Sequence, residues 1–262
     1  MNRSFDDLVR EAESEPIEGW DFTWLDGRAI EDRPAWRYAE LVAARSDAAR
    51  RMLDVECGTA ERITAIPRLP ALTVATEGWL PNIDAAARNL RSRGAHLVIA
   101  PGGANALPFV DGSFDLVTSR HPVETNWSEI ARVLEPGGTY LSQQVGPATL
   151  RELRESLGER LPDRSERDPE RARTAAMSAG LEVLDLRSER PATVFFDIGA
   201  VVYFLRLVVW IVPDFSVERY RERLLALHER IEAEGRFVAH AARFLIEAKK
   251  AETAPSPRRA AG

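Results

Sequence analysis

The stretch Met52–Glu61, with the sequence MLDVECGTAE, constrains the fold of this chain more than any other. Leu53–Val55 completes a short apolar run that predicts a strand, Cys57–Thr59 is a tight turn, and Glu61–Pro67 predicts a short helix. Gly58 tolerates positive φ and allows a ligand to approach the backbone closely. Such a strand–turn–helix unit places a ligand at the carboxyl end of the strand. An ordinary turn that binds nothing would show the same pattern.

The charge at this turn restricts the ligand. Asp54, Glu56 and Glu61 crowd the start of the predicted helix. A dinucleotide site places its pyrophosphate at a helix N-terminus, where three carboxylates would repel it. The glycine fingerprint of dinucleotide-binding folds is also absent. The sequence therefore favours a ligand that carries cationic groups and no phosphate.

Glu77 adds weight to the turn. Leu72–Thr76 predicts a second strand that ends on this acidic residue, 19 positions after Gly58. A carboxylate at about this distance, at the tip of the second strand, is placed to accept hydrogen bonds from ribose hydroxyls. Single acidic residues at strand ends are common, so the interpretation depends on the pairing with the turn.

Two further motifs follow in order: Leu107–Val117 (LPFVDGSFDLV) and Ile130–Gly138 (IARVLEPGG). Together with the Gly58 turn and Glu77, they resemble the class I S-adenosylmethionine (SAM)-dependent methyltransferases. The resemblance is strong over Arg51–Val145 and is one of general layout elsewhere. More narrowly, the chain resembles a group of uncharacterised actinobacterial methyltransferase-like proteins.

The resemblance implies SAM as cofactor and a binding site assembled from the turn and the following strand ends. Its expected cofactor-binding residues are Asp54, Glu56, Gly58, Glu77, Asn105, Ala106, Leu107 and Ser119.

The chain departs from the family pattern at three positions. The family's glycine loop usually has three glycines, but Glu56 and Ala60 occupy the first and third positions here. Gly103 takes the slot of an acidic residue that commonly bonds the adenine amine, and Asn105 offers an amide oxygen instead. Glu56 also carries a charge where the amino-acid end of the cofactor usually passes. Two outcomes are open: the loop moves to accept the cofactor, or binding is weakened or lost.

Catalytic candidates follow the strand predicted at Phe114–Thr118. Methyl transfer gains much of its rate from proximity and orientation, and a base is needed only if the nucleophile arrives protonated. His121 is the candidate base because its ordinary pKa is near neutral. Arg120 is a candidate for holding an anionic substrate group. A histidine that merely hydrogen-bonds the loop before Pro122 fits the pattern equally well.

Size and charge exclude several classes of function. With 262 residues the chain is long enough for one domain with additions. Its net charge of −6 gives no support for broad nucleic-acid binding. The single cysteine, Cys57, and four scattered histidines predict no metal site. The polar start predicts no secretory signal. We expect a cytoplasmic protein with a small-molecule substrate, no nucleic-acid or membrane partner, and a possible homodimer.

Strands and helices alternate along the chain. Strands are predicted at Arg51–Val55, Leu72–Thr76, His96–Ala100, Phe114–Thr118, Thr139–Val145, Leu181–Arg187 and from Arg236 or Phe237 to Ala248; helices are predicted at Ser4–Ser14, Pro34–Arg51, Pro81–Ser92, Thr125–Leu134, Leu150–Leu161 and Asp168–Ala179. The order predicts an α/β, Rossmann-like, seven-stranded, mostly parallel sheet with helices on both faces. By resemblance the last strand is antiparallel. We expect an N-terminal helical arm (1–50), a methyltransferase-like domain (51–248) and a disordered tail (249–262).

A helical insertion is expected before the last strand, over about residues 195–234. Phe195–Pro213 is the most apolar run, is short for a membrane span, and predicts a buried helix. Ser216–Glu234 predicts an amphipathic helix. In this fold the region often covers the substrate pocket, which makes Trp24, Tyr203 and Trp210 substrate candidates. Core packing or a dimer face explains them equally well.

Three functions fit these features. The first is methyl transfer from SAM to an oxygen, nitrogen or carbon atom of a small molecule. The second is a degenerate relative without methyl transfer that acts as a binding or regulatory subunit. The third is catalysis of another reaction, such as a cyclisation, in the same pocket.

Overall fold

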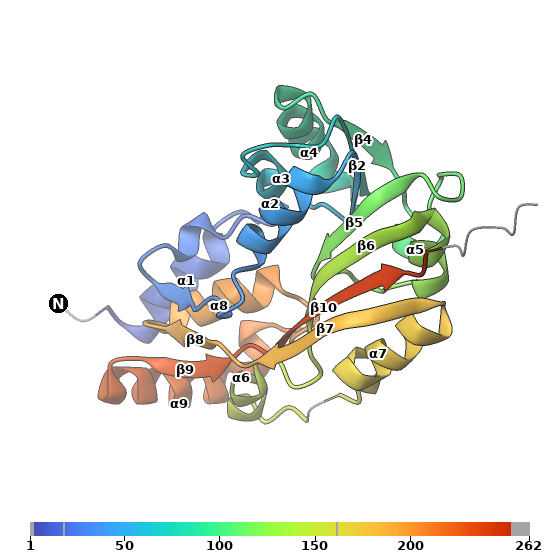
Figure 1. Cartoon of the computed structure of the whole chain (residues 1–262). Coiled ribbons are helices and arrows are strands. Elements are labelled where there is room, and N and C mark those ends of the chain that lie inside the picture. The colour runs from blue at the N-terminus through green and yellow to red at the C-terminus, as the bar shows by residue number, and fades with distance from the viewer. Residues whose placement is uncertain (1–2, 18, 161, 253–262) are drawn as a thin grey trace, which may run out of the picture. The chain divides into compact units, whose positions relative to one another are not determined.

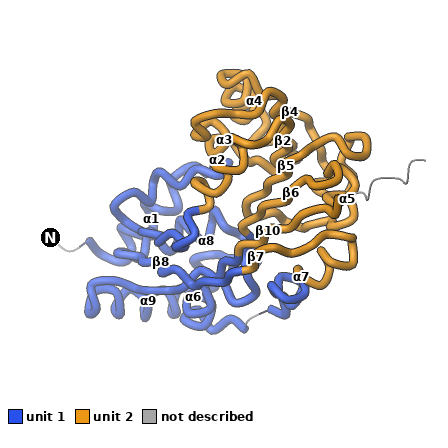
Figure 2. The backbone as a smooth tube through the Cα atoms, viewed as in Figure 1, with its two compact units in different colours: residues 1–37, 144–171, 187–244 blue, residues 38–143, 172–186, 245–262 orange. Residues whose placement is uncertain are grey.

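The structure is a computed structural model that describes residues 3–17, 19–160 and 162–252. The chain divides into two compact units, each assembled from three stretches of sequence (Figure 2). Unit 1 comprises residues 1–37, 144–171 and 187–244; unit 2 comprises residues 38–143, 172–186 and 245–262. The arm, domain and insertion expected from the sequence divide the chain differently and remain a prediction.

Unit 2 is built on a seven-stranded sheet with the order β4-β3-β2-β5-β6-β10-β7 (Figure 1). Its strands are β2 (Arg51–Val55), β3 (Leu72–Glu77), β4 (His96–Ile99), β5 (Phe114–Arg120), β6 (Leu134–Val145), β7 (Leu181–Glu189) and β10 (Arg243–Lys250). The pairs from β4 through β3, β2 and β5 to β6 are all parallel. The predicted α/β fold with a seven-stranded, mostly parallel sheet is therefore confirmed.

The strand order reverses between β2 and β5. From β2 the chain passes outward through β3 to β4, then returns to β5 on the other side of β2. Such a reversal leaves a crevice outside the carboxyl ends of the two strands, where ligands of open α/β sheets bind. The register sets Asp54 opposite Thr118 and Val55 opposite Ser119. Residues that follow β2 and β5 therefore share this edge of the sheet.

The helices of unit 2 begin and end where the sequence has clear signals. They are α2 (Tyr38–Ala48), α3 (Glu61–Thr64), α4 (Leu80–Ser92), α5 (Trp127–Val133) and most of α7 (Pro169–Ser178). Asn126 caps α5 by accepting the N–H of Glu129. Helix α2 begins later than the predicted Pro34, because Arg37 has a φ of 47°, which a right-handed helix does not allow.

Unit 1 holds a three-stranded sheet that the sequence did not predict. The strands are β1 (Ala29–Glu31), β8 (Ala192–Phe195) and β9 (Phe237–His240), with both pairs antiparallel. Its helices are α1 (Phe5–Ser14), α6 (Arg151–Ser156), α8 (Ile198–Leu207) and α9 (Val217–Glu234); three-residue 3-10 turns occur at η1 (Thr23–Leu25) and η3 (Ser165–Arg167), and η2 (Gly103–Asn105) lies in unit 2.

The apolar run at Phe195–Pro213 is not one helix, so that prediction was wrong in its bounds. Phe195 belongs to β8, where it pairs with Phe237. Helix α8 begins at Ile198 because Asp197 caps it, accepting the N–H of Ala200. Nine of the ten residues of α8 are buried, as expected for a helix that is apolar on nearly every side. The amphipathic helix predicted at Ser216–Glu234 is confirmed as α9, and Ser216 is its N-cap.

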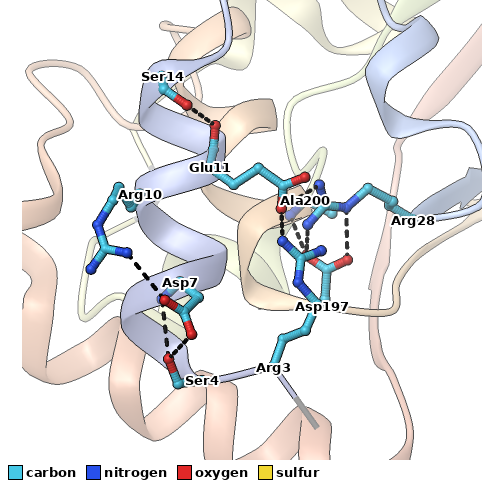
Figure 3. A network of polar contacts seen from close by, with 9 residues as sticks. All are labelled: Arg3, Ser4, Asp7, Arg10, Glu11, Ser14, Arg28, Asp197 and Ala200. Carbon is cyan, nitrogen blue, oxygen red and sulfur yellow. Dashed lines mark hydrogen bonds and ion pairs between the residues drawn. The ribbon is translucent and has the colours of Figure 1, made fainter. Parts of the chain in front are cut away.

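A polar network ties α1 to the start of α8 (Figure 3). Ser4, the first residue of the predicted helix Ser4–Ser14, caps α1 by accepting the N–H of Asp7. The Arg28 guanidinium donates to both carboxylate oxygens of Asp197, at 2.9 and 2.8 Å, and Glu11 lies 3.4 Å from the same guanidinium. Asp197 therefore holds Arg28 while it caps α8.

The last predicted strand is two strands in two sheets. Ala241 and Ala242 separate β9 from β10. The Ala241 N–H extends the β8–β9 register to the Pro191 carbonyl, where the ladder ends because proline has no N–H to donate in return. The Ala242 N–H bonds the Thr149 hydroxyl instead. β10 then continues to Lys250, beyond the predicted end at Ala248. Most of the predicted tail, residues 253–262, lies outside the described residues.

Within residues 3–17, 19–160 and 162–252, none of the helices combines the length and the apolar character needed to cross a membrane.

Candidate functional site

The carboxyl ends of β2 and β3 bring the glycine turn and Glu77 together. The Gly58 N–H donates to Glu77 Oε2 at 2.7 Å, and Glu77 Oε1 accepts the N–H groups of Gly78 and Trp79 at 2.8 and 2.7 Å. Asn82 Nδ2 lies 3.4 Å from Oε2. The side chain is 6% exposed. Glu77 thus fixes the turn to the end of β3, and a ribose would have to replace the Gly58 or Asn82 donor at Oε2.

Asp54 lies beside Thr118 at the reversal of the strand order. The Thr118 hydroxyl donates to Asp54 Oδ1 at 2.5 Å. Burial raises the pKa of Asp54 to about 7. The charge of Glu77 also raises this pKa, whereas the hydrogen bond from Thr118 lowers it. The carboxyl group is therefore near its midpoint of ionisation at neutral pH.

This raised pKa has a consequence for stability. The folded protein holds a proton on Asp54 between the ordinary pKa of 3.8 and about 7, whereas the unfolded chain releases it. The contribution is complete below pH 4 and is lost as the pH rises through 7. We expect wild type to lose about 2 kcal/mol of unfolding free energy between pH 5 and 8 relative to Asp54→Asn. Urea unfolding of both proteins at the two pH values measures this; parallel pH profiles would contradict it.

Glu56 reaches across the carboxyl edge of the sheet. Its Oε2 accepts the N–H of Val123 at 2.7 Å, and the backbone of Ala104 also hydrogen-bonds to this carboxylate. A Cβ built on Gly103 would lie only 2.5 Å from Glu56 Oε1. Burial raises the pKa of Glu56, against the Val123 hydrogen bond. The acidic side chain at 56 and the missing side chain at 103 are therefore linked, since the Glu56 carboxylate fills the space beside Gly103.

The turn keeps a glycine-type backbone although it holds one glycine. Glu56, Gly58 and Ala60 have φ values of 58°, 62° and 61°. For residues with a Cβ, this left-handed conformation costs roughly 1–2 kcal/mol each. Burial raises the pKa of the Cys57 thiol well above its ordinary value, so this cysteine stays protonated and is a poor nucleophile.

The candidates that follow β4 lie on the turn η2 and the segment after it. Asn105 and Ala106 are exposed, and Asn105 Nδ2 lies 3.5 Å from Glu124 Oε2. Leu107 is buried, and its N–H donates to Glu129 Oε2 at 2.8 Å. Asn105 and Ala106 are accessible to a ligand, whereas the side chain of Leu107 is part of the core.

The catalytic candidates lie at the end of β5. His121 has a φ of 56°, and its N–H donates to the Gln143 carbonyl at 2.7 Å. The Gln143 amide nitrogen lies 3.1 Å from His121 Nε2. Because an amide nitrogen only donates, His121 Nε2 is the acceptor and the ring proton sits on Nδ1. Proton transfer to Nε2 therefore requires Gln143 to release it. Arg120 ends the strand beside His121.

Ser119 points into a buried polar cluster. Its hydroxyl lies 2.7 Å from the Tyr140 hydroxyl and 2.9 Å from the Ser142 hydroxyl, and its carbonyl accepts from the Tyr38 hydroxyl at 2.8 Å. It is 1% exposed. Ser119 thus forms its hydrogen bonds within the protein, and its contact with the cofactor remains a prediction.

The substrate candidates all belong to unit 1 and fall into two groups. The Trp24 and Tyr203 rings pack at a tilt of 31° with centroids 4.7 Å apart, and they line one hollow with Asp21. The Arg28 guanidinium covers the Trp24 ring at 3.8 Å. Trp210 packs instead against Trp20, at 5.0 Å, and lines a different hollow. The structure therefore does not join the three candidates in one pocket.

Sequence reasoning missed three groups that hold the site residues. They are the Thr118 hydroxyl on Asp54, the Val123 N–H on Glu56 and the Asn82 amide near Glu77. Strand register would have found Thr118, which is paired with Asp54 across β2 and β5. No sequence pattern reveals the other two. Among the described residues, no group of three or more His, Cys, Asp or Glu side chains is arranged to hold a metal ion.

Comparison with known families shows what the stretch around this site is similar to. Residues 53–142 match the family described as "Methyltransferase domain". The match covers less than half of the chain, so it shows only what this stretch is similar to. The matched stretch begins within β2 and ends within β6, includes the reversal point, and contains every cofactor candidate.

Curated relatives match the chain over part of their length. The biotin biosynthesis bifunctional protein BioHC of Teredinibacter turnerae is 30% identical over 177 residues, 59% of this chain and 30% of that protein. The demethylmenaquinone methyltransferase of Thermus thermophilus is 32% identical over 120 residues, 43% of this chain and 54% of that protein. The chain thus spans about half of the length of these relatives or less.

Solved structures share the fold of this chain. The YcgJ protein of Bacillus subtilis has a TM-score of 0.59 at 16% identity, covering 83% of this chain and 99% of that one. A putative methyltransferase from Bacillus halodurans has a TM-score of 0.57 at 18% identity, covering 81% of this chain and 97% of that one. At these identities the likeness establishes the fold alone.

Proposed function

We propose that this protein is a SAM-dependent methyltransferase that acts on a small molecule. The observation that carries the proposal is the position of the Glu77 carboxylate, at the end of β3 and 2.7 Å from the Gly58 N–H. This is where a ribose diol would find its acceptor in the methyltransferase family. The matched family and the demethylmenaquinone methyltransferase among the relatives support the same reaction class.

The chemistry of the site fits SAM. Asp54, Glu56 and Glu77 stand close enough for the charge of Glu77 to raise the pKa of both other carboxyl groups. Such a cluster suits a ligand with an amino group and a sulfonium and repels a pyrophosphate. Asn105 and Ala106 are exposed on the adenine side. Glu56 must also turn, since its carboxylate bonds across this edge.

Each residue would then have a defined role. SAM, when bound, supplies the activated methyl group. Glu77 would accept the ribose hydroxyls, and Asp54 would be held ionised by the cationic ligand. His121 would take a proton from the substrate at Nε2 after Gln143 releases it, and Arg120 would orient an acidic substrate group. A cytoplasmic location and a homodimer remain predictions.

Replacing His121 tests the base role. His121→Asn keeps a residue that tolerates positive φ. We expect its turnover to fall roughly a hundredfold, the low end of the range for a general base, with SAM affinity within twofold of wild type. Stopped-assay rates and calorimetric affinities measure the two effects. The matched control is His96→Asn, at an exposed histidine of β4. Equal losses in turnover and affinity would argue against the base role.

Titration of the full chain with SAM and S-adenosylhomocysteine tests the function itself. Micromolar binding, followed by S-adenosylhomocysteine formation with a small-molecule panel, supports the proposal. A folded protein that binds neither compound contradicts it. That result would favour a binding or regulatory subunit, which the cross-bonded Glu56 carboxylate also suits. Binding without S-adenosylhomocysteine formation would favour another reaction in the same site.

A further inference from the structure

Unit 1 contains a hollow that is rich in arginine and that includes, of the candidate site residues, Trp210 alone. It is formed by the segment after β6, helix α6, the segment around η3 and the chain after α8. Its polar and aromatic lining consists of Thr149, Arg154, Arg164, Arg167 and Trp210. None of the described residues that line it is acidic.

Arg154 is the buried member of this lining. It is 6% exposed, its Nη1 donates to the Ile211 carbonyl, and its Nη2 donates to the Arg160 carbonyl at 2.9 Å. Its Nε is buried and has no partner among the described residues. Burial lowers the pKa of Arg154, and the charge of Arg164 lowers it further. The Arg154 guanidinium is thus buried beside two backbone carbonyl groups, and its Nε–H has no hydrogen-bond partner among the described residues.

No described carboxylate forms an ion pair with Arg154 or Arg164. Glu159 attracts Arg154 from a distance, but its Oε1 accepts the Tyr220 hydroxyl at 2.5 Å. Burying a charge without a partner costs several kcal/mol. The interior charge of Arg154 therefore lacks the counter-charge that usually accompanies such burial.

Arg164 and Thr149 add further donors to the lining of the same hollow. Arg164 donates one hydrogen bond, from Nη2 to the Trp210 carbonyl at 3.2 Å, and a guanidinium has five N–H groups. The Thr149 hydroxyl accepts from Ala242 N and Arg243 Nη1, both at 3.1 Å, which leaves its own proton to donate. The hollow therefore presents donors from several side chains and two or more positive charges.

We propose that this hollow binds an oxyanion, the phosphate or carboxylate group of a small ligand. Guanidinium groups bind both through charge-assisted hydrogen bonds, and an oxyanion would supply the missing counter-charge of Arg154. The Arg154 Nε–H, the Thr149 hydroxyl and the outer N–H groups of Arg164 are its donors. The site does not depend on the proposed methyl transfer.

Titration of the full chain with inorganic phosphate and with acetate tests the site, with ionic strength held constant by chloride. We expect saturable binding in the millimolar range and, at tenfold excess over Kd, a rise in melting temperature of about 4 °C. The buried Arg154 Nε–H resonance should shift on binding. The oxyanion that binds more tightly identifies a phosphate or a carboxylate as the natural group.

Variants distinguish this site from general attraction of anions. Arg164→Gln should weaken binding about tenfold. The matched control, Arg160→Gln, removes an exposed arginine of the same segment whose side chain does not line the hollow, and should leave affinity unchanged. Equal effects of the two variants, or no saturation below about 100 mM and hence an adventitious ion only, would overturn the proposal.

Discussion

Glu77→Ala is expected to abolish measurable SAM binding, a loss of more than about a hundredfold, and to lower the unfolding free energy by about 3 kcal/mol. The variant removes the proposed ribose acceptor. It also leaves the N–H groups of Gly58, Gly78 and Trp79 without the carboxylate that they bond at 2.7, 2.8 and 2.7 Å. Calorimetry with SAM and urea unfolding measure the two effects separately.

Glu61→Ala is the matched control for this experiment. Glu61 is an exposed carboxylate in the first turn of α3, close in sequence to the same turn. Both its SAM affinity and its stability should remain near wild type. A folded Glu77→Ala protein that binds SAM within twofold of wild type would remove Glu77 from the proposed ribose site, whatever its stability.

Glu56→Gly is expected to increase SAM affinity by about tenfold or more. The substitution removes the carboxylate that bonds the Val123 N–H and fills the space beside Gly103. It also places glycine at a φ of 58°, which relieves roughly 1–2 kcal/mol of backbone strain. The relief offsets the lost hydrogen bonds, so stability should change little. Calorimetric titration of the variant measures the gain.

Glu56→Gln tests whether the shape or the charge of the Glu56 side chain limits SAM affinity. The amide keeps the length of the side chain and removes its charge, so it should give little of the gain. If Glu56→Gly instead binds SAM more weakly than wild type, the carboxylate is itself a ligand of the cofactor. It would then take over the acceptor role that the family gives to the acidic residue at the position of Gly103.

The main sheet could be predicted because its signals are local. The strand predicted at Arg51–Val55 has the same bounds as β2. Ser4 and Ser216 cap the helices predicted at Ser4–Ser14 and Ser216–Glu234. Each of these signals depends on residues within a few positions of one another. Local periodicity and capping therefore determine most of the element order.

The sheet of unit 1 could not be predicted because its pairings are distant and its strands short. Ala29 pairs with Phe195, and Ala192 pairs with His240. Strands of three and four residues are too short for an alternation to be recognised in the sequence, although β8 does alternate in burial. The break after Ala241 also depends on a distant residue, Pro191, which accepts from the Ala241 N–H and has no N–H to return. Such contacts exist only after the chain has folded.

The sequence predicted where the site lies, but it did not predict all of the hydrogen bonds that its side chains form. The spacing from Gly58 to Glu77 predicted two groups that the structure brings within 2.7 Å. The sequence could not reveal that Glu56 bonds the backbone of Val123, since no residue type marks a backbone donor 67 positions away. Motifs report which chemistry is present, whereas the partners of each oxygen depend on loop geometry.

The division of both units among separate stretches sets the order of events during synthesis. The apolar core of unit 1 joins Phe5 and Leu8 to Phe237 and Ala239, and β10 fits between β6 and β7 in the main sheet. Neither unit can therefore be completed until nearly the entire chain has left the ribosome. Helix α1 is synthesised early and cannot pack until its partners in unit 1 have been made. Synthesis proceeds at roughly 5–20 residues per second. A ribosome that stalls before β9 would release a chain in which both units are unfinished.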